Sequence, residues 1–121
     1  HEKQEQIVEL PNGLRFLVFE ANNKYKLKNI SNNLEYLNLS NMNVDSIIPF
    51  EELHNLKVMK LNNCKINQLS NILKNHQLEY LSLFQCTIDT LEYNDINNSL
   101  KYLYVNRLNL GNWNWLRTMI N

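Results

Sequence analysis

The sequence predicts an α/β repeat solenoid of about five coils. We expect a short parallel β-sheet on one side and 3-10, short helical or irregular segments on the other. Two observations predict this fold. Segments that begin with leucine recur at a nearly constant interval along the chain. Within each segment, apolar and polar residues alternate as they do in a strand with one buried face.

The repeat interval defines the domain organisation. The aligned segments begin at Leu14, Leu34, Leu56, Leu78 and Leu100, which are 20, 22, 22 and 22 residues apart. Apolar residues recur at the first, fourth, sixth and eleventh positions, with Lys24 as the exception. The predicted repeats are 14–33, 34–55, 56–77, 78–99 and 100–121, and residues 1–13 form a partial first coil or an amino-terminal cap.

Each repeat contains a strand and a return path. The pair Leu37 and Leu39 illustrates the period of two that describes a strand. Later apolar residues such as Leu69 and Ile72 are spaced by three, which suits a turn of helix, although Asn75 breaks the third repeat at its next such position. One coil is too small to enclose a core, so neighbouring coils must stack to bury their leucines. Burial of one leucine side chain stabilises the fold by roughly 1.5–3 kcal/mol.

The segment from Leu14 to Asn121 resembles the leucine-rich-repeat family, whose motif is L-x-x-L-x-L-x-x-[N/C]-x-L. The 22-residue period is similar to the subclass typified by a regulatory subunit of protein phosphatase 1. The resemblance implies that the variable strand positions are exposed on a concave face, which is the usual ligand face. It also implies that the ninth position points inward and bonds to backbone. That position holds Asn22, Met42, Cys64, Cys86 and Leu108.

Cys64 and Cys86 share the ninth position in consecutive repeats. One interpretation is a pair of buried thiols that act as small core residues. The other is a disulfide or redox pair, because stacked strands lie about 4.8 Å apart. Parallel side chains that both point inward favour the first interpretation.

Two further columns describe the exposed strand surface. The second positions alternate in charge, which predicts a ladder of ion pairs between neighbouring strands: Arg15, Glu35, Lys57, Glu79 and Lys101. The third positions are mostly aromatic: Phe16, Tyr36, Val58, Tyr80 and Tyr102. Exposed tyrosines supply large contact areas at low entropic cost, so this row predicts a partner-binding surface. The candidate partner-binding residues are Phe16, Tyr36, Lys60, Tyr80, Phe84, Tyr102 and Tyr104.

Composition argues against several other functions. Twelve basic residues balance twelve acidic ones, so the basic surplus that binds nucleic acid is missing. No apolar run approaches the roughly 20 residues of a membrane span. No motif for phosphate binding, redox chemistry or zinc hydrolysis occurs, so we expect no enzymatic activity, no cofactor and no metal. Because the cysteine-rich caps of secreted family members are missing, the cytoplasm is favoured over secretion.

The leading hypothesis is a non-enzymatic module that binds a protein partner on the strand face. Two alternatives stay open: an extracellular recognition domain of the innate-immune or receptor type, and the substrate-targeting repeat domain of a larger enzyme or effector. The last repeat carries apolar residues that no sixth coil covers. We therefore expect this edge to be covered by further chain or by a second copy in a homodimer.

Overall fold

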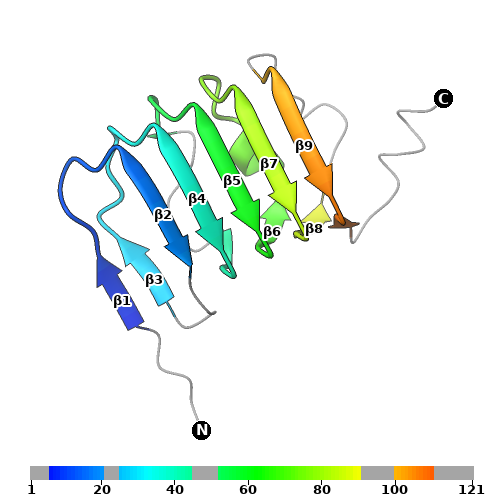
Figure 1. Ribbon diagram of the computed structural model, residues 1–121, viewed down its shortest axis with the longest axis horizontal. Helices are drawn as coiled ribbons and strands as arrows, with labels where there is room; N and C mark the ends of the chain where they lie inside the picture. Colours follow the sequence, from blue (N-terminus) through cyan, green and yellow to red (C-terminus); the bar gives the residue numbers. More distant parts are fainter. Residues whose placement is uncertain (1–5, 21–24, 45–51, 91–99, 111–121) are drawn as a thin grey trace, which may run out of the picture.

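The chain forms a parallel β-solenoid of about four turns with little helix, as shown by a computed structural model (Figure 1). The structure describes residues 6–20, 25–44, 52–90 and 100–110. Five strands run side by side in one direction and form the largest sheet. They are β2 (Phe16–Glu20), β4 (Tyr36–Ser40), β5 (Val58–Asn62), β7 (Tyr80–Phe84) and β9 (Tyr102–Asn106).

The register of this sheet confirms the repeat alignment. Tyr36 pairs with Phe16 on one side and with Val58 on the other, and the same repeat position is paired at every later step. The predicted repeat solenoid with stacked parallel strands is therefore present. Because each step joins identical positions, every column read from the sequence becomes a physical row across the sheet.

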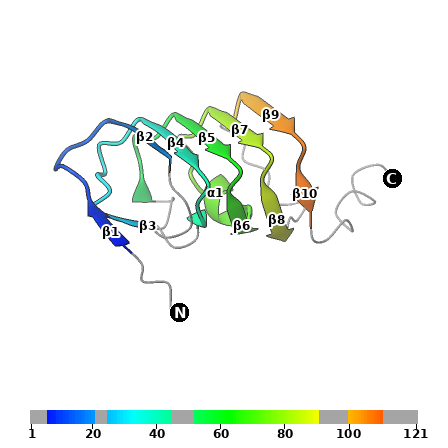
Figure 2. The ribbon, with the colours of Figure 1, turned by 60° about the horizontal axis from the view of Figure 1, so that its bottom comes forward.

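The return path contains more strand than expected. A second sheet joins β6 (Lys65–Gln68), β8 (Thr87–Thr90) and β10 (Asn109–Leu110), and a two-stranded sheet joins β1 (Gln6–Glu9) and β3 (Tyr25–Lys28) (Figure 2). Within the described ranges, the only α-helix is α1 (Ser70–Leu73), which follows β6 directly. No helix in this part of the chain has the length and apolar character needed to cross a membrane.

The core lies between the large sheet and the return path. The fourth and sixth positions of the three central strands are buried, as the alternation predicts. They are Leu37, Leu39, Met59, Leu61, Leu81 and Leu83. From the return path, Ile66 and Ile88 and the predicted apolar positions Leu53, Leu69 and Ile72 are also buried. The equivalent apolar positions Ile47 and Phe50, and those beyond Leu110, lie outside the described residues.

A left-handed residue follows each of the last four strands of the large sheet. The eighth repeat position has a positive φ in Asn41, Asn63, Gln85 and Arg107, with angles of 61°, 53°, 54° and 56°. Asparagine tolerates this conformation, whereas other residues with a Cβ are disfavoured in it. The Asn63 side chain also donates a 2.7 Å hydrogen bond to Oδ1 of Asn41, so amides stack along this bend.

Asn75 is a buried polar residue at a position where the repeat predicts an apolar one. Only 1% of its surface is exposed. Its Nδ2 donates a 2.9 Å hydrogen bond to the carbonyl oxygen of Leu53 in the preceding coil, and its Oδ1 accepts one of 3.0 Å from the Gln77 amide. The break in the sequence pattern is therefore a polar link between two coils.

We predict that Gln85→Asn stabilises the protein by about 0.5–1 kcal/mol, because it relieves part of the roughly 1–2 kcal/mol cost of a left-handed side chain. The new amide would also stand beside Asn63. Urea unfolding measures the change. The matched control is Gln68→Asn, the same substitution in β6, where φ is not positive. An equal change in both variants would contradict the explanation.

We predict that Asn75→Ala lowers the free energy of unfolding by about 1–3 kcal/mol, because the Leu53 carbonyl loses the donor from the next coil and the Gln77 amide loses its acceptor. Asn75→Asp should cost at least as much, since a carboxylate of the same shape cannot donate that hydrogen bond. The exposed neighbour His76 supplies the control, and His76→Ala should change stability by less than about 0.5 kcal/mol.

Candidate functional site

The candidate site is the side of the large sheet opposite the buried leucines, here called the open face. It carries the third, fifth and seventh positions of each strand. Phe16 and Tyr102 lie on its two outer strands and are 61% and 64% exposed, whereas Tyr36 and Tyr80 are half-buried. The hydrogen-bonded sheet fixes the spacing of these rings along the face.

The aromatic row divides into two ring pairs. Phe16 and Tyr36 have ring centroids 6.3 Å apart, and Tyr80 and Tyr102 have theirs 6.2 Å apart. Val58 lies between the two pairs in the register of the sheet. Its small side chain leaves room between the rings of Tyr36 and Tyr80.

Lys60 occupies this space at the centre of the open face. Its Nζ lies 5.6 Å from the ring centroid of Tyr36 and 5.9 Å from that of Tyr80. Both distances fall within the range of cation–π attraction. The structure therefore brings three of the predicted partner-binding residues into one cluster.

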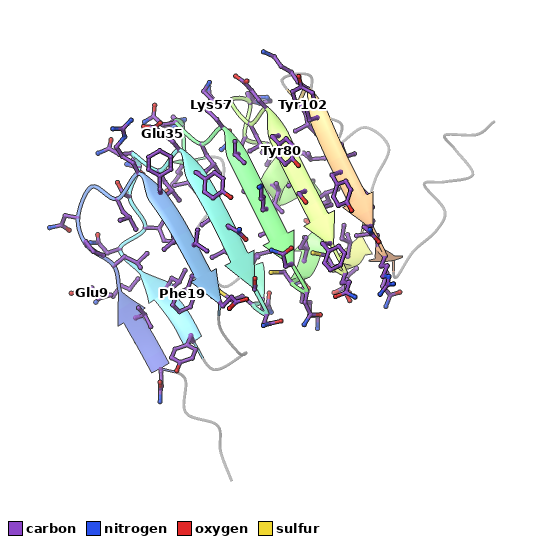
Figure 3. All side chains as sticks on the ribbon, viewed as in Figure 1. Glu9, Phe19, Glu35, Lys57, Tyr80 and Tyr102 are labelled. Atoms are coloured by element: carbon purple, nitrogen blue, oxygen red, sulfur yellow. The ribbon has the colours of Figure 1, made fainter. Side chains whose placement is uncertain are left out.

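The charge ladder runs along the edge where the strands begin, and Figure 3 shows Glu35 and Lys57 at that edge. Nε of Arg15 donates to Oε2 of Glu35 at 2.6 Å. Glu79 accepts ion pairs from Lys57 at 3.5 Å and from Lys101 at 3.7 Å. The hydrogen bond from Arg15, followed by its charge, lowers the pKa of Glu35. These charges are exposed and largely neutralise one another.

The two outlying predicted residues lie elsewhere on the open face. Tyr104 is on β9, where its hydroxyl accepts a 2.9 Å hydrogen bond from Nδ2 of Asn106. Phe84 lines a hollow of about 580 Å³ at the ends of the strands. The hollow is otherwise mostly polar, and Asn62 donates there to Oδ1 of Asn38 at 3.0 Å. Phe84 is therefore grouped with amide side chains and not with the tyrosine row.

Ser82 is a member of this surface that the sequence pattern did not predict. It lies in the row between Lys60 and Tyr104, and these larger neighbours leave it only 8% exposed. Its short side chain gives the longer ones room to lie across the face. The signal available in the sequence was a small residue at the fifth repeat position, where the neighbouring repeats have the much larger Lys60 and Tyr104.

Cys64 and Cys86 are free and buried, which confirms the first interpretation of this pair. The Cys86 thiol is 3.3 Å from the carbonyl oxygen of Leu61, and the Cys64 thiol is 3.5 Å from that of Leu39. Both thiols therefore donate to the backbone of the preceding coil. Burial raises the pKa of Cys64 and raises that of Cys86 to about 11, so neither is a thiolate at neutral pH.

The described part of the chain contains no group of three or more His, Cys, Asp or Glu side chains that could hold a metal ion. Comparison with family models, curated proteins and solved structures gave no match to this chain.

We predict that Cys86 makes stability fall with pH. The unfolded thiol ionises near pH 9.0 and the folded one near pH 11, so the folded state keeps its proton between these values. Its contribution is complete below pH 9 and is lost as pH rises toward 11. The free energy of unfolding of the wild type, relative to Cys86→Ser, should fall by about 1–2 kcal/mol between pH 8.5 and 10.5.

The control for this measurement is Val58→Ala, which keeps both thiols and should keep the wild-type pH dependence. The other ionisable groups are common to all three proteins, so their effects cancel in the difference. Parallel stability curves for the wild type and Cys86→Ser would contradict the prediction.

Proposed function

We propose that this chain is a non-enzymatic protein–protein interaction module that binds its partner on the open face. The observation that carries the proposal is the row of aromatic rings across the five-stranded sheet, which is exposed at its two outer strands and half-buried between them. Tyrosine is enriched where protein interfaces derive most of their binding energy. The neighbouring charges are paired with one another, so the central rings and Lys60 are the groups available to a partner.

We also propose the finer assignment of the repeat. The chain would be a leucine-rich-repeat protein of five repeats, with the open face as its concave side. The column of apolar positions and the inward ninth position support it, since Cys64 and Cys86 bond to backbone as that motif requires.

The last strand supports a further part of the proposal. Leu103 of β9 is 58% exposed, although the equivalent residues of the three central strands are buried. Val105 is likewise exposed. We propose that this edge is covered by a second copy of the chain or by further chain, because exposed apolar edges of repeat arrays normally require a cap.

We predict that Tyr80→Ala combined with Tyr102→Ala reduces partner capture at least about tenfold, because the two rings form one contact surface. The measurement is quantitative affinity capture with the wild-type and variant chains on beads. Lys74→Ala is the control, since Lys74 is exposed at the end of α1 and away from the open face.

The informative partner is one that the wild type and Lys74→Ala capture equally and that the double variant loses. Circular dichroism and urea unfolding establish that the double variant is folded. If the folded double variant retained every partner, the open face would not be the binding surface.

A further inference from the structure

Lys60 is the one cation at the centre of the open face in the described residues, and it is held by rings and not by a carboxylate. Its ammonium contacts the rings of Tyr36 and Tyr80, and its neighbours in the row are the neutral Asn38 and Ser82. None of the ion pairs among the described residues includes Lys60. The rings orient the charge, but they leave it without a neutralising group.

The cations of the charge ladder differ from Lys60, because each of them is paired with a carboxylate. Arg15 is paired with Glu35, and Lys57 and Lys101 share Glu79. A partner that approaches the open face therefore meets one central positive charge with aromatic rings on both sides. Covering that ammonium with neutral atoms would remove its water without replacement, which is costly, whereas a carboxylate would restore a favourable interaction.

We propose that the protein partner places an aspartate or glutamate side chain on Lys60, with apolar residues on either side that contact the tyrosine rings. This inference rests on the proposed function and specifies the partner's chemistry. The required feature is a single acidic residue with apolar neighbours, because the aromatic row extends from Lys60 toward Phe16 on one side and Tyr102 on the other.

A single-stranded nucleic acid could also use stacked rings and a cation. The arrangement favours an acidic peptide, because a phosphate chain needs several cations in a row. The row beside Lys60 instead alternates in sign, and Glu35 and Glu79 would repel successive phosphates. The formal net charge of zero also argues against nucleic acid as the partner.

The test is selection of a randomised peptide library, displayed on phage, against the wild type, Lys60→Glu and Lys65→Glu. Lys65 is exposed on β6, in the second sheet, so it is a matched charge reversal away from the open face. We expect the wild type and Lys65→Glu to enrich one acidic position, and Lys60→Glu to enrich a basic residue at that position.

A second measurement isolates the interaction between Lys60 and the acidic residue of the peptide. For a peptide selected with the wild type, changing its acidic residue to the amide should weaken binding about tenfold for the wild type and less than twofold for Lys60→Met, which keeps a long apolar side chain. If the tenfold loss persisted with Lys60→Met, or the acidic preference persisted with Lys60→Glu, the inference would be overturned.

Two outcomes separate this inference from the proposed function. If selected peptides lose binding to the Tyr80→Ala, Tyr102→Ala double variant but show no acidic preference, the proposed function stands and the role of Lys60 is wrong. If no peptide binds the open face, the proposed function itself fails. Binding of a thymidine oligonucleotide that Lys60→Glu abolishes would overturn the inference in favour of nucleic acid.

Discussion

Leu37, Met59 and Leu81 are fully buried, although no single coil is thick enough to enclose them. Each is covered only because its counterpart one coil away occupies the same position in the register. The burial of leucine between stacked coils therefore requires the strands to align position by position. Since residues alternate across a strand, that alignment also sets the third and fifth positions on the opposite side. The open face is thus a consequence of how the core is buried.

Stacking also requires every coil to bend at the same place. The bend after the strand uses a left-handed residue, and asparagine fills it in two of the four described cases. Just inside the bend, Cys64 and Cys86 donate to carbonyl oxygens of the preceding coil. Asn75 makes the same kind of link on the return path. Polar groups at these points therefore connect one coil to the next.

On the open face and along its edge, side chains at the same repeat position form rows, and two of these rows differ in how their members interact. Where the repeated residue alternates in charge, ion pairs join three of the four neighbouring steps, and both carboxylates are paired. Where the repeated residue is aromatic, the rings contact one another or the cation between them. The edge of paired charges thus differs from the centre, where rings surround a cation that has no carboxylate, and a partner of the proposed kind would recognise this contrast.

The sequence by itself determined the repeat solenoid, the strands of the large sheet, the leucines buried in its central strands and the membership of each row, because a fixed period converts sequence spacing directly into spatial register. Only the tertiary structure decided which members of those rows meet. The small Val58 lets Lys60 reach two tyrosines, and Phe84 lies instead among amides at the strand ends. The second sheet and the burial of Asn75 and Ser82 were also decided only by the tertiary structure. Side-chain reach and contacts between coils decide such features, and neither is encoded in the period.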